Sequence, residues 1–112
     1  MASRKREGAP GGRRNGAERD RILTRLRQYL PTCMSRYGVK SLGVFGSFVR
    51  GEQSPESDLD LLVEFSQPPS LLEFLSMEHE LSDLLGVKVD LVMRDALKPT
   101  IGQYILREVV RV

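Results

Sequence analysis

Two aspartates separated by one residue lie in a short apolar stretch of the chain. Asp58 and Asp60 belong to the segment SDLDLLVEF, in which polar and apolar residues alternate as in a β-strand with one buried face. Because strand residues two apart share a face, both carboxylates point the same way, about 6.5 Å apart at Cα. Their like charges raise each other's pKa unless a cation lies between them. Carboxylate ligands select hard cations, and a site completed by phosphate oxygens suits Mg²⁺.

A third aspartate lies in the next strand-like segment, VKVDLVM. Asp90 shares a face with Lys88, opposite the apolar residues of that segment. We therefore expect Asp58, Asp60 and Asp90 to form one patch at the edge of a sheet. Three carboxylates without a cation would leave at least one of them protonated at pH 7. If the acids had only a structural role, Lys88 would be their one nearby counter-ion. A centre with two metal ions would relieve that repulsion and stabilise the attacking and leaving oxygens of a transfer reaction.

A glycine-serine turn precedes these acids by ten residues. Gly46 follows the short apolar segment VKSLGVF and would let the backbone approach a ligand closely. Ser47 would open a short helix whose unpaired N–H groups attract phosphate. Arg50, one turn later, would reach the same phosphates with its planar guanidinium. Each signal is common alone, but together they indicate a site for phosphate and metal.

The scaffold implied by the sequence alternates helices with short strands. Helical spacing runs from Glu18 to Gly38, where Pro31 indicates either a kink or two short helices. A second helix is bounded by Ser70 as N-cap and Gly86 as C-cap, and a last helix starts after Pro99. The element order predicts an α/β (α+β) fold, a mixed sheet of about three strands with helices packed on it.

Charge is unevenly distributed along the 112 residues. Residues 1–21 carry seven Lys or Arg and three Asp or Glu, a net charge of +4 in a chain whose total is +2. We interpret residues 1–17 as a disordered basic segment and residues 18–112 as one domain. The basic segment would offer contacts to RNA, although a solvated tail is the simpler interpretation. With a single cysteine, no secretory signal and no apolar run of membrane-spanning length, a cytoplasmic location is expected.

The sequence resembles the nucleotidyltransferase superfamily that includes DNA polymerase beta and kanamycin nucleotidyltransferase. It is most similar to the minimal nucleotidyltransferase (MNT) antitoxins of HEPN–MNT toxin–antitoxin pairs. The resemblance covers roughly residues 19–112 and rests on FGSFVRGEQSPESDLDLLVEF, ELSDLLGVKVDLV and ALKPTIGQYILREVVRV. The family's Gly-Ser, ten residues, Asp-x-Asp pattern is intact, its third acid falls on Asp90, and the Arg50-Gly51 step also matches.

This resemblance implies a nucleotidyl transfer from ATP. Asp58 and Asp60 would ligate two Mg²⁺ ions and Asp90 one of them, with Asp90 also the candidate base. Gly46, Ser47 and Arg50 would hold the phosphates of the nucleotide. The implied acceptor is a tyrosine of the cognate HEPN toxin, an RNase that AMP addition silences. Since the domain has little room for an acceptor site, we expect another subunit to present the acceptor.

Two other functions stay open at this stage. The protein would act as an antitoxin by occlusion if it bound nucleotide and toxin without transfer, but occlusion alone does not require Asp90. Transfer to a small hydroxylated molecule, such as an aminoglycoside, would require a homodimer to build the acceptor pocket. The sequence does not distinguish ATP from other nucleoside triphosphates.

Overall fold

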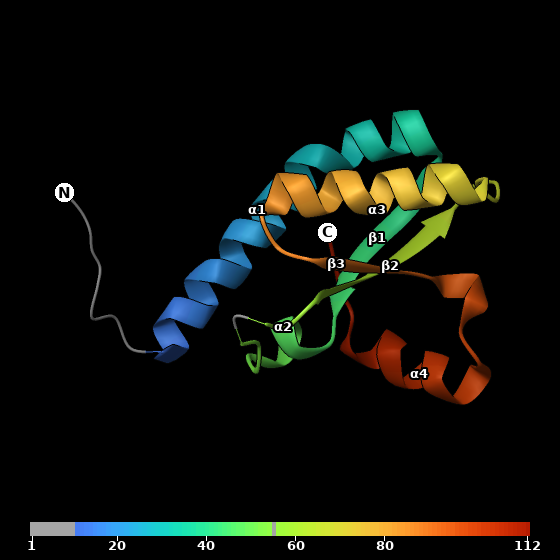
Figure 1. Cartoon of the computed structure of the whole chain (residues 1–112). Helices are drawn as coiled ribbons and strands as arrows, with labels where there is room; N and C mark the ends of the chain where they lie inside the picture. The colour runs from blue at the N-terminus through green and yellow to red at the C-terminus, as the bar shows by residue number, and fades with distance from the viewer. Residues whose placement is uncertain (1–10, 55) are drawn as a thin grey trace.

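A four-stranded sheet forms the centre of the computed structural model, which describes residues 11–54 and 56–112 (Figure 1). Its strands, in the order β3-β2-β1-β4 across the sheet, are β1 (Val39–Phe45), β2 (Leu59–Phe65), β3 (Val89–Met93) and β4 (Val110–Arg111). β1 pairs antiparallel with both β2 and β4, whereas β2 and β3 are parallel. The expected α/β class with a mixed sheet is confirmed. The described residues contain one strand more than expected, because the two residues of β4 are too few to show alternation.

The helices are unevenly distributed about this sheet. Their bounds are α1 (Gly11–Tyr37), α2 (Ser47–Arg50), α3 (Leu71–Leu85), the 3₁₀ turn η2 (Arg94–Ala96) and α4 (Pro99–Glu108). Figure 1 shows α1 and α3 side by side on one face of the sheet and α4 on the other side, while α2 follows the end of β1 and adds the buried Phe48 to the core. α3 is the crossover that parallel pairing of β2 and β3 requires. No helix in the described part of the chain is both long and apolar enough to cross a membrane.

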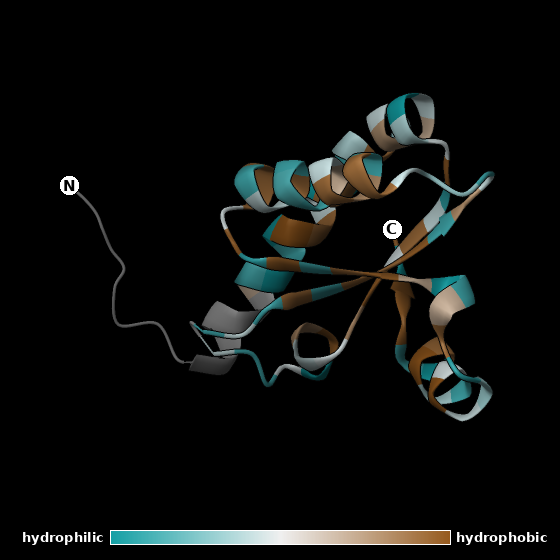
Figure 2. Cartoon of the chain, turned by 45° about the vertical axis from the view of Figure 1, so that its right-hand side comes forward, coloured by the Kyte–Doolittle hydropathy of each residue, from teal (hydrophilic) through white to brown (hydrophobic). Residues whose placement is uncertain are grey.

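The hydrophobic core lies between the sheet and the pair α1 and α3. Leu59, Leu61 and Val63 of β2 have no exposed surface, as their alternation predicts. α1 and α3 complete the core with fully or almost fully buried side chains, which are Ile22, Leu26, Cys33, Met77, Leu81 and Leu85. Figure 2 shows hydrophobic residues along much of the strands, while the helices carry both hydrophilic and hydrophobic residues. The residues between the buried ones in β2 therefore point to the opposite face.

The ends of α3 confirm the expected capping residues. The Ser70 hydroxyl accepts the N–H of Glu73, and the Glu73 carboxylate accepts the N–H of Ser70, which is a capping box. Gly86 ends the helix in the left-handed conformation, with φ of 72°. α3 is therefore fixed at both ends between the two strands that it connects.

The first helix is longer than the sequence suggested. α1 stays helical through Pro31, and it begins at Gly11, so residues 11–17 of the expected disordered segment are helical in the structure. Residues 1–10 of that segment lie outside the described residues. The division into a basic segment and a domain therefore remains a prediction.

A polar contact on the outside of the core ties α3 to α1. The Glu80 carboxylate accepts hydrogen bonds from the hydroxyls of Tyr29 and Tyr37 and pairs with Arg36. The hydrogen bond from Tyr29 is the largest cause of a lowered pKa of Glu80, with Tyr37 and Arg36 acting in the same direction against partial burial. These contacts fix the lateral position of the two helices, which apolar packing alone specifies only loosely.

Candidate functional site

A tight turn at Gly46 carries the chain from β1 into α2. Gly46 has φ of 83° and ψ of −152°, and its carbonyl accepts the N–H groups of Val49 and Arg50 at 3.1 and 3.2 Å. A Cβ at Gly46 would lie 2.2 Å from Oδ2 of Asp60. The positive φ strongly favours glycine, and a larger residue would also push the Asp60 carboxylate out of its position. The glycine therefore brings the turn directly against the carboxylate of Asp60.

The predicted carboxylates are gathered around the same point. Asp60 is the partner of Phe45 across β1 and of Asp90 across β3. It projects from the face of β2 opposite the buried Leu59 and Leu61. Asp58 immediately precedes β2 and is half-buried, whereas Asp90 is exposed. The parallel register of β2 and β3 thus places Asp60 beside Asp90, and Asp58 lies near enough to Asp60 to raise its pKa.

The electrostatics of Asp60 indicate a site that lacks positive charge. Partial burial raises the pKa of Asp60, and the neighbouring Asp90 and Asp58 raise it further, while Arg50 acts in the opposite direction. Since the net shift is upward, the one nearby guanidinium does not neutralise the cluster. A divalent cation bound by the three carboxylates would do so.

The donor set fits a hard cation such as Mg²⁺ without enclosing it. Within the described residues, no group of three or more His, Cys, Asp or Glu side chains is arranged so that it could hold a metal ion by itself. Mg²⁺ in nucleotide-dependent enzymes is typically held by one or two carboxylates, with substrate phosphates and water completing its shell. Asp58, Asp60 and Asp90 would therefore need phosphate and water oxygens to complete a Mg²⁺ site.

Arg50 lies beside the turn but already has two acidic partners. Its Nε donates to Glu52 at 2.9 Å and its Nη1 donates to Glu108 at 2.6 Å. These hydrogen bonds, from Glu52 first and then from Glu108, raise the pKa of Arg50. Glu108 also accepts the N–H of Gly46 at 2.8 Å. No local pattern singles out Glu108, since an acid at the end of a helix is ordinary and its partners are 58 and 62 residues away.

Ser47 is the first residue of α2 and is half-buried. In the part of the chain that the structure describes, its hydroxyl has no hydrogen-bond partner. α2 has only four residues, so its dipole is weak, and phosphate would be attracted by individual donors of Ser47 and Arg50. The predicted phosphate residues are therefore contiguous with the predicted metal ligands.

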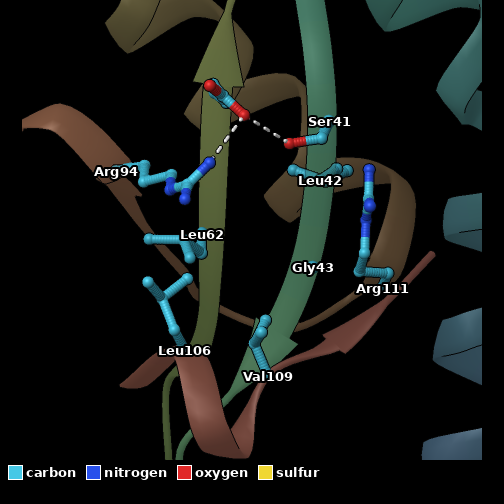
Figure 3. A pocket seen from close by; sticks show the side chains of 9 residues that line it. Ser41, Leu42, Gly43, Leu62, Arg94, Leu106, Val109 and Arg111 are labelled. Carbon is cyan, nitrogen blue, oxygen red and sulfur yellow. Dashed lines mark hydrogen bonds and ion pairs between the residues drawn. The ribbon is translucent and has the colours of Figure 1, made fainter. Parts of the chain in front are cut away.

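A cavity of about 250 Å³ lies farther along the same face of the sheet (Figure 3). Leu62 and Glu64 follow Asp60 at two-residue spacing in β2, and both line this cavity. Figure 3 shows Ser41 and Arg94 converging on one carboxylate, that of Glu64, which accepts a hydrogen bond of 3.2 Å from each. None of the six predicted site residues lines the cavity. The cavity adjoins the candidate site and is distinct from it.

Comparisons with known proteins agree with this arrangement. A family model described as a nucleotidyltransferase domain matches residues 21–112. The protein adenylyltransferase MntA of Thermococcus cleftensis is 50% identical over 95 residues, which cover 85% of this chain and 93% of that protein. A solved structure described as a minimal nucleotidyltransferase has a TM-score of 0.74 and 37% identity, and the match covers 84% of this chain and 95% of that chain.

A more distant structure shares the fold. It is a complex of a tri-AMPylated HEPN toxin from Shewanella oneidensis with its MNT antitoxin, matched at a TM-score of 0.56 and 16% identity over 87% of this chain and 70% of that chain. At that identity the likeness concerns the fold alone. The coverage and identity of the nearer relatives carry the assignment: the chain belongs to the nucleotidyltransferase family, among the minimal nucleotidyltransferases of the protein adenylyltransferase type.

Proposed function

We propose that this protein is a Mg²⁺-dependent adenylyltransferase that transfers AMP from ATP to a tyrosine of a cognate HEPN toxin and thereby neutralises it. The observation that carries the proposal is the close packing of the Gly46 turn against Asp60, with Asp90 in register on the next strand. In this proposal the arrangement would place a phosphate-binding turn next to metal-binding carboxylates. Nucleotidyl transfer requires both at the same place.

The protein's own residues supply binding, orientation and proton transfer. Ser47 and Arg50 would bind the terminal phosphates, and Gly46 would allow their close approach to Asp60. Asp58, Asp60 and Asp90 would hold Mg²⁺, which when bound supplies charge neutralisation for the attacking and leaving oxygens. The acceptor oxygen forms a bond to the α-phosphorus while the bond to pyrophosphate breaks. The hydroxyl proton passes to a base, for which Asp90 is the candidate because it is the most exposed of the three acids.

Two findings favour a protein as acceptor. The relative from Thermococcus cleftensis is a protein adenylyltransferase, and a solved structure of the same fold holds a HEPN toxin that carries three AMP groups. Another solved toxin–antitoxin structure of this fold contains the ATP analogue AMP-PNP. A tyrosine has a pKa of about 10, so its hydroxyl needs help to lose a proton at pH 7, which is consistent with a base at Asp90.

The proposal is tested by incubating the protein with Mg²⁺, α-labelled ATP and the proposed HEPN toxin partner. Label is expected on a tyrosine of the HEPN protein, together with loss of its RNase activity. Asp90→Asn should slow transfer about 100-fold while changing nucleotide affinity less, because a general base acts mainly in the transition state. Asp83→Asn is the matched control, since that acid lies on α3 with its side chain 76% exposed.

Two results would contradict the proposal. Protection of RNA without label on the HEPN protein would favour occlusion. Label on a small hydroxylated compound, with none on the HEPN protein, would favour a small-molecule transferase.

A further inference from the structure

Glu108 is a mostly buried side chain on a helix whose other residues are largely exposed. Along α4 only Gly102 is buried, and Ile101 and Tyr104 are 54% and 64% exposed. The side chain of Glu108, the last residue of α4, is nevertheless only 14% exposed. Its two oxygens have different partners: Oε2 accepts the N–H of Gly46 at 2.8 Å, and Oε1 accepts Nη1 of Arg50 at 2.6 Å. Glu108 therefore joins the C-terminal end of α4 to both ends of the phosphate turn.

Both contacts are short hydrogen bonds to a charged carboxylate. Partial burial alone would raise the pKa of Glu108, but the N–H of Gly46 and the guanidinium of Arg50 outweigh it and hold this pKa below its usual range. The carboxylate is therefore ionised near neutral pH, and charge-assisted hydrogen bonds of this length are about twice as strong as neutral ones. Glu52, the other partner of Arg50, has a side chain that is 64% exposed, where an ion pair contributes little.

The donors of Arg50 are not exhausted by this pairing. A guanidinium has five N–H donors, and the bonds to Glu52 and Glu108 use Nε and one N–H of Nη1. The remaining donors are free to bind phosphate while Glu108 stays in place. The single N–H of Gly46, in contrast, is already used. The turn would then bind phosphate through Ser47 and Arg50, with Gly46 providing the space.

We propose that Glu108 is a positioning residue for the nucleotide: its carboxylate fixes the Gly46 peptide and the Arg50 guanidinium so that the turn is ordered before the triphosphate binds. This inference rests on the proposed function, since it concerns the same phosphate site. The physical reason is that Arg50 is a long side chain, whose immobilisation would otherwise be required during binding. Glu108 removes that requirement in the free protein.

The test measures binding of MgATP to the full chain by calorimetry in the absence of any acceptor. Glu108→Gln is expected to raise the Kd about tenfold, because it keeps an acceptor for Gly46 but loses the charge that holds Arg50. Glu108→Asp should restore part of the affinity, which a loss of packing alone would not explain. Glu52→Gln is the matched control, because it removes the exposed partner of the same arginine, and its Kd should stay within about twofold of the wild type.

Three outcomes would overturn the inference. An unchanged Kd for Glu108→Gln, even with a lower melting temperature, would reduce Glu108 to a structural tie between α4 and the turn. A lower Kd would mean that its carboxylate competes with phosphate. If Glu52→Gln raised the Kd as much as Glu108→Gln, any acidic neighbour of Arg50 would serve equally well, and Glu108 would have no specific role. The calorimetry contains no acceptor, so it tests the role of Glu108 in nucleotide binding even if the protein does not transfer AMP to a HEPN protein.

Discussion

The two faces of the central sheet differ in what their residues contact. On the covered face, Leu59, Leu61 and Val63 are fully buried in an apolar core cluster that includes side chains of α1 and α3. On the open face of the same strand, Asp60 contacts the Gly46 turn, and Glu64 pairs with Ser41, Arg94 and Lys40. Alternate residues of one strand thus serve stability and chemistry separately.

This separation predicts which property each substitution changes. A residue on the covered face is coupled to the free energy of unfolding through packing, and it is not in contact with the reacting groups. The charged residues of the open face contribute little packing. Ionised Asp60 lowers the stability of the fold, because burial and like charges raise its pKa. Substitutions on the two faces should therefore have opposite signatures.

The largest effect is expected on the open face. Asp60→Asn should lower the rate of transfer at least about 1,000-fold, because a metal ion contributes several kcal/mol to the transition state. The metal-free variant should unfold at the same or a higher temperature, because the raised pKa means that ionised Asp60 destabilises the fold near neutral pH. Single-turnover labelling and thermal unfolding measure the two effects. Wild-type transfer by this variant would remove Asp60 from the metal site.

The opposite signature is expected on the covered face. Leu81→Ala should lower the free energy of unfolding by about 2–5 kcal/mol, because Leu81 has no exposed surface and truncation leaves a cavity. The activity per folded molecule should change little. Urea unfolding compares it with Leu72→Ala, whose side chain is 77% exposed and whose substitution should stay within about 0.5 kcal/mol. A large loss of activity per folded molecule would show that the two faces are coupled.

A pH-dependent effect is expected at the contact between α1 and α3. Glu80→Gln should lower the free energy of unfolding at pH 7 by about 2 kcal/mol, because hydrogen bonds to a charged acceptor are lost. Since the pKa of Glu80 is lowered in the folded protein, its contribution is present above the unfolded value of 4.5 and is lost as the pH falls through the folded value. Urea unfolding at pH 7 and pH 3.5 should show the difference shrinking. A difference independent of pH would mean that only packing was changed.

The smallest effect is expected at the phosphate turn. Ser47→Ala should weaken binding of MgATP about fivefold, the value of one hydrogen bond of about 1 kcal/mol, and leave the melting temperature unchanged. Ser76→Ala on the exposed side of α3 is the control. If Ser47→Ala bound nucleotide normally but transferred AMP slowly, the hydroxyl would act in the chemical step and not in binding.

Local patterns accounted for much of the covered face. The alternation in SDLDLLVEF identified the buried residues of β2, and Ser70 and Gly86 marked the ends of α3. Such signals are available because the periods of strands and helices, and the capping residues, are local properties of the chain. The start of α1 and the two-residue strand β4 were missed because neither has a local signal: β4 exists through its pairing with Gly43 and Val44 of β1.

By itself, the sequence determined the types and spacing of Gly46, Ser47, Asp58 and Asp60, because this constellation lies within one short stretch of chain. Only the tertiary structure decided the register that pairs Asp90 with Asp60, the close approach of Gly46 to the Asp60 carboxylate, and the contact of Glu108 with the turn. Strand register and contacts between residues some 60 positions apart depend on how all elements pack together. No local period encodes them.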